Sequence, residues 1–281
     1  MSIIVSHNIR RYYEHNDKRF RKFGIDTRDH NIHQPLWDGN TKTKRQAANY
    51  ANHLVLRIIK DTLTEGKDRI KILDLGSGFG ATIKYIISNA DADALEFSGI
   101  TISRTQAGFA REKLGERIRI VCKDYHDLSR YFRGMDIVYA IESVVQARDI
   151  SVLLHEVSRV LKPNGLFVVI DDFIDDERDS EFADRRIIRD YQANWFADGL
   201  MDCKHFQALA GENGLRLKRA DNLNPYVKWY TRSRVTALLY LAGLRHADNL
   251  YLKSLIGGGA RQLAIRKGIL NYRMAVFTKS P

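Results

Sequence analysis

Five short apolar segments alternate with helix-like segments between residues 69 and 173, and this alternation constrains the fold more than any other feature. The segments are rich in β-branched side chains, as buried strands are. The predicted strands are RIKILDL (69–75), ALEFSGITI (94–102), RIRIVCKD (117–124), MDIVYAIES (135–143) and LFVVIDDF (166–173). Helices are predicted at 82–90, 103–115 and 150–165, the second opened by Ser103 and closed by Gly115. The spacing predicts an α/β, Rossmann-like, doubly wound sheet with helices on both faces.

The flanking segments complete this domain. A helix is predicted at 42–64, a long charged helix or lid at 176–200, and a further helix at 204–214. RLKRADN (216–222) and YRMAVFTKS (272–280) read as two late strands, which makes the sheet seven-stranded and mostly parallel. We therefore expect four parts, listed in chain order: an N-terminal cap (1–41), a core with lid (42–224), a helical substrate-side insert (225–268) and the last core strand (269–281).

Composition excludes several classes of protein. The 281-residue chain has a formal charge of +11, which attracts anions or serves solubility alone. No apolar run is long enough to span a membrane, and the N-terminus lacks the apolar core of a secretory signal. The two cysteines, Cys122 and Cys203, favour a reducing, cytoplasmic location over a disulfide framework. No HExxH-like spacing occurs, so we expect no protein metal site.

The segment DLGSGFG (74–80) follows the first strand and opens a helix, as nucleotide-binding loops do. Its glycines permit positive φ and close approach of a ligand to the backbone. Residues 76–81 also satisfy a dinucleotide pattern, but the second strand ends in GITIS without the acid that holds a ribose. Asp74 repels pyrophosphate and attracts a cation. The loop therefore favours S-adenosylmethionine (SAM), which carries an ammonium and a sulfonium and no phosphate.

Further motifs identify a family resemblance over about residues 40–175. They are KILDLGSGFG, SGITISRTQAGFA, CKDYHDL, MDIVYAIESVVQARD and EVSRVLKPNGLFVVID, with a looser match at YYEHNDKRFRKFG and IHQPLW. As a set they resemble the class I SAM-dependent methyltransferases. The nearest branch comprises small-molecule C-methyltransferases of sterols, tocopherol, prenyl diphosphates and indole alkaloids. In this branch a Thr and a Gln replace the usual ribose-binding acid.

The resemblance implies a set of cofactor-binding residues. The methionine end of SAM would lie against the glycine loop, the ribose against the end of the second strand, and the adenine against the end of the third. Tyr12 or Tyr13 would close over the sulfonium or carboxylate from the cap. The implied residues are Asp74, Gly76, Ser77 and Gly78 for methionine, Thr101 and Gln106 for ribose, Asp124 and Tyr125 for adenine, and Glu142 near cofactor and substrate.

The same resemblance implies chemistry on an alkene. Methyl transfer to a double bond leaves a carbocation, which aromatic faces stabilise and a base must deprotonate. Glu142 is the first candidate for this base, with His33 or His155 as alternatives, and Tyr13 joins Glu142 and His33 as a candidate catalytic residue. Glu142 could instead be a structural carboxylate, hydrogen-bonded to the cap or to a nearby arginine.

The least generic part is the apolar and basic insert. An apolar helical run there, VTALLYLAGL, is flanked by cations. This arrangement suits an apolar binding slot with an anion clamp, meaning basic side chains that bind an anionic group at its mouth. Candidate substrate-binding residues are Trp37, Tyr226, Trp229, Arg232 and Arg234. A solvated helix or a homodimer contact explains the same composition. The acceptor expected is a small apolar molecule with an anionic group, a prenyl diphosphate or terpenoid, and Mg²⁺ enters only through a substrate diphosphate.

Rival functions remain open from sequence. One keeps the enzyme of specialised (secondary) metabolism but methylates nitrogen, oxygen or carbon of an indole or other aromatic natural product. A second is a nucleic-acid protein suggested by charge, although no RNA-binding module or NPPY-type motif stands after the fourth strand. A third is an interaction protein that retains the fold without activity. Our expectation is a small-molecule enzyme with no nucleic-acid partner and no membrane span.

Overall fold

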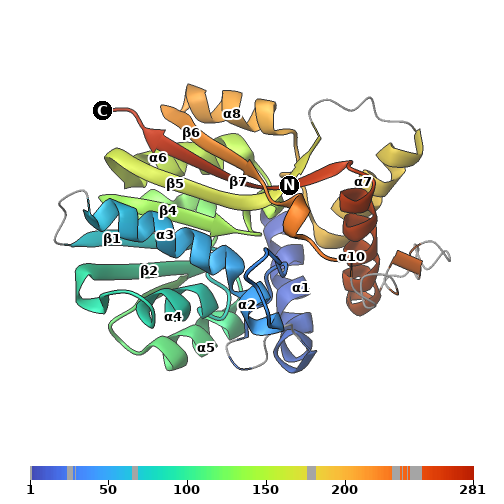
Figure 1. Cartoon of the computed structure of the whole chain (residues 1–281), viewed down its shortest axis with the longest axis horizontal. Helices are drawn as coiled ribbons and strands as arrows, with labels where there is room; N and C mark the ends of the chain where they lie inside the picture. The colour runs from blue at the N-terminus through green and yellow to red at the C-terminus, as the bar shows by residue number, and fades with distance from the viewer. Residues whose placement is uncertain are drawn as a thin grey trace.

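A seven-stranded sheet forms the centre of the computed structural model (Figure 1). The structure describes residues 2–23, 28, 30–64, 69–175, 182–229, 235, 237–238, 240 and 249–281. The strand order is β3-β2-β1-β4-β5-β7-β6, and β7 runs antiparallel to both of its neighbours. The strands are β1 Ile70–Leu75, β2 Leu95–Thr101, β3 Arg119–Cys122, β4 Met135–Ile141, β5 Leu161–Ile174, β6 Leu215–Asn222 and β7 Leu270–Lys279. The predicted mostly parallel α/β sheet is confirmed.

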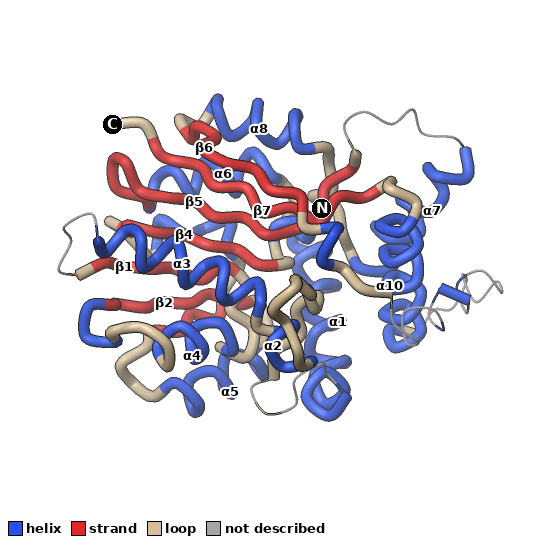
Figure 2. Tube along the Cα trace, viewed as in Figure 1, coloured by secondary structure: helices blue, strands red, loops and turns tan. Residues whose placement is uncertain are grey.

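Helices cover both faces of the sheet (Figure 2). Strand residues alternate between the two faces: Leu73 and Leu75 pack toward α6 and α8, whereas Ile70 and Ile72 pack toward α3, α4 and α5. The helices are α1 Ser2–Phe23, α2 Lys44–Ala48, α3 Tyr50–Thr64, α4 Ala81–Ile87, α5 Arg104–Leu114, α6 Ile150–Val160, α7 Phe182–Trp195, α8 Cys203–Glu212 and α10 Leu250–Arg266. Short 3-10 helices lie at Ala92–Ala94, Tyr125–Arg130, Val144–Gln146 and Asn224–Tyr226.

Most predicted boundaries agree with the structure within a few residues. The Ser103 hydroxyl accepts a hydrogen bond from Gln106 N at the start of α5, and Gly115 closes that helix at φ +74°, as predicted. The helix predicted at 42–64 is interrupted at Asn49, which caps α2. The helix predicted at 150–165 ends at Val160, so that prediction was too long. Pro163 has no N–H to continue a helix, and residues 161–165 instead begin β5.

A third apolar cluster joins α7 to α10 outside the main sheet. Tyr191 of α7 and Ile256 and Ala260 of α10 are buried in it. Gly257 provides the close approach, because a Cβ at this position would lie 2.2 Å from the Trp195 ring. In Figure 1 these helices and α1 gather at one end of the sheet. The C-terminal half of the predicted insert therefore forms a wall beside the core.

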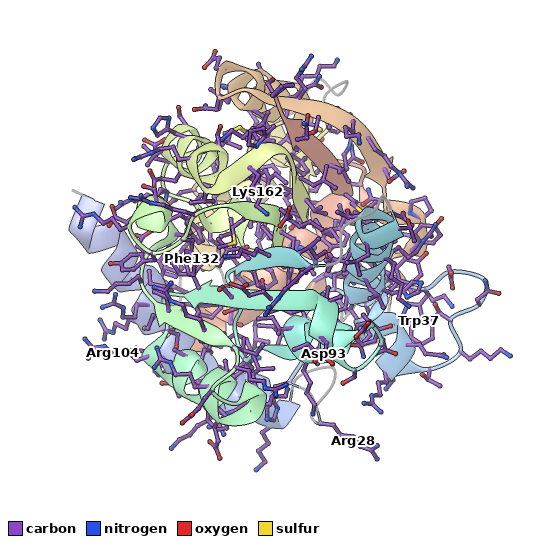
Figure 3. The ribbon with its side chains drawn as sticks, turned by 90° about the vertical axis from the view of Figure 1, so that its left-hand side faces the viewer. Arg28, Trp37, Asp93, Arg104, Phe132 and Lys162 are labelled. Carbon is purple, nitrogen blue, oxygen red and sulfur yellow. The ribbon has the colours of Figure 1, made fainter. Side chains whose placement is uncertain are left out.

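The opposite end of the sheet is closed by salt bridges and turns. Figure 3 looks onto it, with Asp93, Phe132 and Lys162 labelled near the starts of β2, β4 and β5. Lys162 Nζ lies 2.7 Å from the buried carboxylate of Asp136. Ligands of parallel sheets bind at the carboxyl ends of the strands, which is the end that faces α1 and α10.

Candidate active site

One cavity of about 730 Å³ lies at the carboxyl ends of β1, β2, β4 and β5. Residues from α1, from the loop at 30–37 and from α10 complete its walls. It contains the predicted cofactor residues Asp74, Gly76, Ser77, Gly78, Thr101, Gln106, Asp124, Tyr125 and Glu142, together with Tyr13, His33 and Trp37. Residues far apart in the sequence therefore meet in one space. Their individual roles remain predictions.

The glycine loop is shaped by close packing as well as by φ. Gly76 has φ +78°, and a Cβ there would lie 2.5 Å from the Ser143 Cβ. Gly76 N and Ser77 N both donate to Ile100 O at 2.9 Å, which ties the loop to β2. The loop is held close to the sheet, and its bare backbone is available to a ligand.

Asp74 is 4% exposed and points into the same cavity. Burial raises the pKa of its carboxyl group to about 7. A carboxylate in this position is stabilised by a cationic ligand that shares its environment. The structure therefore supports the electrostatic argument for a cation beside the loop.

Two polar atoms around the loop suit a hydroxyl-bearing ligand. Thr101 Oγ1 donates to Gln106 Oε1 at 3.0 Å, so the Gln106 amide oxygen is occupied. Gln106 Nε2 and Ser77 Oγ are buried and have no hydrogen-bond partner within the described ranges. Buried polar groups normally find partners. The ribose and methionine groups of SAM would supply them.

Asp124 lies where the adenine is expected. Its Oδ1 accepts from His126 N at 3.0 Å and contacts His126 Nδ1 at 2.5 Å. Tyr125 donates to Ser143 O at 2.8 Å, and Arg148 Nη1 lies 3.9 Å from Asp124 Oδ2. These contacts fix the loop after β3 against the loop after β4. The sequence did not indicate His126 or Arg148.

Glu142 follows β4 with φ +51°, which is unusual for a non-glycine residue. Its Oε1 accepts a hydrogen bond from Gln34 N at 2.9 Å and lies 3.6 Å from Arg261 Nη2. Burial raises its pKa, and the Arg261 charge opposes that shift. Glu142 is thus held by the cap and lies beside an arginine. These contacts fit the alternative hypothesis that Glu142 is a structural carboxylate. Its side chain, still 22% exposed, also lines the cavity.

A buried pair beside Glu142 was missed from sequence. Arg261 of α10 donates to Asp172 of β5 through Nε, at 2.5 Å, and through Nη2, at 2.8 Å. Its Nη1 donates to Gln34 Oε1 at 2.6 Å. Asp171, the neighbour of Asp172, accepts from Val145 N at 2.9 Å, and burial raises its pKa to about 8. The acid pair at the end of the fifth strand was the available signal, whereas nothing local marked Arg261.

Aromatic residues also line the cavity, together with these acidic residues. Tyr13 of α1 donates to Gln146 Oε1 at 2.5 Å, and burial raises the pKa of its hydroxyl. Tyr12 is also buried and packs 5.6 Å from Phe196 between ring centroids. Tyr191 and Trp195 line the cavity from α7. This part of the cavity therefore combines carboxyl groups with aromatic faces.

Several predicted residues lie elsewhere. Tyr226 packs on Tyr50, and Trp229 lies under Arg266; neither is among the described cavity-lining residues. His155 is exposed on α6, which removes it as the alternative base. Trp37 does line the cavity, with Lys228 Nζ 4.7 Å from its ring centroid. Arg232 and Arg234, the predicted anion clamp, lie outside the described residues.

Metal-binding clusters and membrane-spanning helices are both absent from the part of the chain that the structure describes. No cluster of three or more His, Cys, Asp or Glu side chains there could hold a metal ion. No helix within the described ranges is long and apolar enough to cross a bilayer.

Comparison with known proteins agrees with the geometry. A family model described as a methyltransferase domain matches residues 73–169. Sterol 24-C-methyltransferase of Aspergillus fumigatus is 33% identical over 125 residues, covering 44% of this chain and 33% of that enzyme. A sarcosine/dimethylglycine N-methyltransferase of Aphanothece halophytica is 25% identical over 140 residues, covering 49% and 46%. The matched region thus spans a third to about half of these curated relatives' length.

Solved structures extend the likeness to the whole chain. A cyclopropane synthase of Mycobacterium tuberculosis superposes with a TM-score of 0.74 at 16% identity, covering 98% of both chains. Geranyl diphosphate C-methyltransferase of Streptomyces coelicolor superposes with a TM-score of 0.66 at 16% identity, covering 98% of this chain and 97% of that one. At these identities the likeness shows the fold alone. The chain thus matches a methyltransferase-domain family over residues 73–169, and it shares the overall fold of these solved enzymes.

Proposed function

We propose that the protein is a SAM-dependent C-methyltransferase that methylates a carbon–carbon double bond of an isoprenoid, such as a prenyl diphosphate or terpenoid. The observation that carries this proposal is the acceptor end of the cavity, where Glu142 and Asp171 stand among Tyr13, Tyr191 and Trp195. A carbocation formed by methylation of an alkene is stabilised both by carboxylates and by aromatic faces. The sterol 24-C-methyltransferases and geranyl diphosphate C-methyltransferases among the matched proteins support the same acceptor class.

In this proposal, some residues of the chain bind the cofactor and one accepts a proton. SAM, when bound, supplies a sulfonium methyl group for in-line transfer to the acceptor. Asp74, Ser77 and Gln106 would hold its polar groups, and Tyr13 would cover it from the cap. Glu142 would take the proton from the carbon next to the cationic centre, which restores a double bond. The walls exclude water, which would otherwise quench the cation.

In this proposal, the predicted N-terminal cap acts as a lid over the site, and the predicted insert determines its specificity. The cap (1–41) would close the cofactor side through Tyr13 and Gln34, and the insert (225–268) would face the acceptor through α10. Arg232 and Arg234 would bind an anionic group of the acceptor, with Mg²⁺ bridging if that group is a diphosphate. A cytoplasmic role in specialised metabolism completes the proposal.

A second candidate is methylation of nitrogen, oxygen or carbon in an indole or other aromatic amine. It is favoured by the acidic lining of the cavity. Arg261 pairs with Asp172 and lies 3.6 Å from Glu142. The pKa of Asp171, raised by burial to about 8, keeps that group mostly protonated at pH 7. A protonated amine would favour the ionised form of these acids, as a carbocation would. The sarcosine/dimethylglycine N-methyltransferase relative is consistent with this candidate.

A single acceptor screen separates the two candidates. The protein is incubated with methyl-labelled SAM and with isoprenyl diphosphates, sterols, indoles, phenols or amines, and the label is located by mass spectrometry and NMR. A carbon-bound methyl group on an isoprenoid supports the first candidate. A label on a heteroatom or on an aromatic ring selects the second. Failure to bind SAM in calorimetry would reject both.

A further inference from the structure

A chain of buried hydrogen bonds connects the backbone of α2 to the His33 ring. Asn49 Nδ2 donates to Arg45 O at 2.9 Å, and Asn52 Nδ2 donates to Asn49 Oδ1 at 2.9 Å. Thr82 Oγ1 donates to Asn52 Oδ1 at 2.9 Å and lies 3.1 Å from His33 Nε2. Asn49, Asn52 and Thr82 are each at most 7% exposed. We call these three residues the amide chain.

The direction of every bond in the amide chain is fixed by the backbone carbonyl at its end. Arg45 O can only accept, so Asn49 presents its NH₂ group to it and its oxygen to Asn52. Asn52 therefore presents its NH₂ group to Asn49 and its oxygen to Thr82. The single hydroxyl proton of Thr82 is used on that oxygen. Thr82 Oγ1 can then only accept from His33.

His33 must accordingly carry its proton on Nε2. Burial lowers the pKa of His33 to about 4, so the ring is neutral near pH 7. The opposite tautomer would turn the Thr82 hydroxyl around and leave the buried Asn52 oxygen without a donor, which is costly. It would also place a proton on Nδ1, which faces a carboxylate oxygen at 3.9 Å.

That oxygen belongs to Glu142. His33 Nδ1 lies 3.9 Å from Glu142 Oε2 and is buried with no hydrogen-bond partner among the described residues. The other carboxylate oxygen, Oε1, is occupied by Gln34 N. The unpartnered ring nitrogen and the second carboxylate oxygen of Glu142 thus face each other, and neither supplies a proton.

We propose that His33 is a positioning residue that receives the hydrogen bond of Glu142 once Glu142 has taken a proton. This inference rests on the proposed function. In the deprotonation step a C–H bond next to the cationic centre breaks, its electron pair forms the new double bond, and the proton binds Glu142 Oε2. The neutral acid then moves toward His33 Nδ1, and the gap of 3.9 Å closes to a hydrogen bond in which Glu142 donates. Solvent removes the proton when the site opens.

The amide chain thereby sets the basicity of Glu142. A ring with Nδ1–H would donate to the ionised carboxylate and stabilise it, which weakens the base. A ring with Nε2–H stabilises the protonated acid instead. Other charged or titratable groups surround Glu142, namely Arg261 of α10, Asp171 and Asp172 of β5, Tyr272 of β7 and Tyr13 of α1. None of them is changed by a substitution in the amide chain.

The tautomer can be measured without an acceptor. Protein labelled with ¹⁵N-histidine is studied by long-range ¹H–¹⁵N correlation at neutral pH, and a His33→Gln spectrum assigns His33 among the nine histidines. We expect His33 to show a protonated Nε2 and an unprotonated, strongly downfield Nδ1. A protonated Nδ1 or an imidazolium at neutral pH overturns the proposal, whichever variants fold.

Variants of Thr82 then test the effect on Glu142. Thr82→Val removes the acceptor for Nε2–H, so we expect a mixture of tautomers, and Thr82→Ser should restore the parent spectrum. Thr62→Val is the matched control, because the Thr62 hydroxyl is buried but bonds only to Ile58 O in the described part of the chain. It should leave His33 unchanged.

The titration of Glu142 gives the decisive readout. With ¹³C-labelled glutamate assigned by Glu142→Gln, we expect Thr82→Val to lower the proton affinity of Glu142 by about tenfold. A changed tautomer with an unchanged Glu142 titration overturns the inference. Activity reports separately on the proposed function: if Glu142→Gln retains full turnover on an identified acceptor, Glu142 is not the base, whatever the His33 spectrum shows.

Discussion

Arg261 on α10 and Asp172 in β5 form a two-pronged ion pair, with Nε–Oδ2 at 2.5 Å and Nη2–Oδ1 at 2.8 Å, although 89 residues separate them. Both side chains are at most 4% exposed. The pair attaches α10, which forms one wall of the cavity, to the sheet. Because burial removes water from both charges, each depends on the other.

Removing one member of this pair should be strongly destabilising. Arg261→Met leaves Asp172 buried without a counter-charge, and we expect a loss of about 3–5 kcal/mol in the free energy of unfolding by urea. Arg261→Met combined with Asp172→Leu should recover much of that loss. Lys71→Met is the control, since its pair with Glu96 is exposed and worth about 0–1 kcal/mol. Equal losses for Arg261→Met and Lys71→Met would contradict the prediction.

The pKa of Asp74 predicts how cofactor affinity depends on pH. The carboxyl group titrates at about 7 in the free protein, and only its ionised form attracts the ammonium of SAM. Affinity should therefore be highest above pH 7 and fall by up to about tenfold per pH unit below it. Calorimetry with SAM across this range checks the slope. Asp74→Asn should bind weakly with a flat profile, and a flat profile in the parent protein would refute the prediction.

Two glycine substitutions should have opposite effects. Gly76→Ala places a methyl group 2.5 Å from the Ser143 Cβ at φ +78°, so we expect lost SAM binding and a loss of about 1–3 kcal/mol in stability. Gly108→Ala on α5 meets no atom within 4 Å and should stabilise the helix by about 0.5–1 kcal/mol. Thermal denaturation with and without SAM measures both. Intact binding by Gly76→Ala would show that the loop tolerates a side chain.

Glu142→Gln should separate chemistry from binding. The amide keeps an oxygen to accept from Gln34 N but removes the proposed base, so kcat should fall by about 10²–10⁴, far more than the affinity for SAM. Glu156→Gln is the matched control, because Glu156 is a buried carboxylate of α6 that accepts from Ser129 N at 2.7 Å, away from the cavity. A kcat loss of the same size in both variants would point to a structural effect.

The anion clamp is testable although Arg232 and Arg234 lie outside the described residues. Arg232→Ala or Arg234→Ala should raise KM for a diphosphate acceptor by about tenfold or more, because a charge-assisted hydrogen bond contributes about 1.5–3 kcal/mol. SAM affinity should stay constant. Arg185→Ala, an exposed position on α7, should change neither constant. Unchanged KM in both clamp variants would argue against an anionic acceptor.

Local patterns were sufficient to predict that the residues of the glycine loop and of the neighbouring strand ends lie in one cavity. Asp74, Gly76 and Gln106 belong to strand ends and helix starts, where spacing along the chain determines position in space. The end of α6 at Val160 also had a local cause in Pro163, but the pattern alone did not show that β5 starts directly at Leu161.

The acceptor side could not be predicted in this way. Arg261 meets Asp172, and His33 meets Thr82, only because α10 and the loop at 30–37 pack against distant parts of the chain. Aromatic composition likewise selected Trp37, Tyr226 and Trp229 as a group, yet only Trp37 lines the cavity. Composition does not determine the direction of a side chain, and a pairing between distant elements leaves no local signal.

Gln34 connects Glu142 to α10. Its backbone N–H fixes one oxygen of Glu142, while its side chain is gripped by Arg261 and Gln262 of the facing helix. A movement that separates the Gln34 loop from α10, to admit or release a molecule, would therefore also free the Glu142 carboxylate. Under the proposed function, a carbocation would therefore form only while Gln34 connects both segments and the cavity is closed around it.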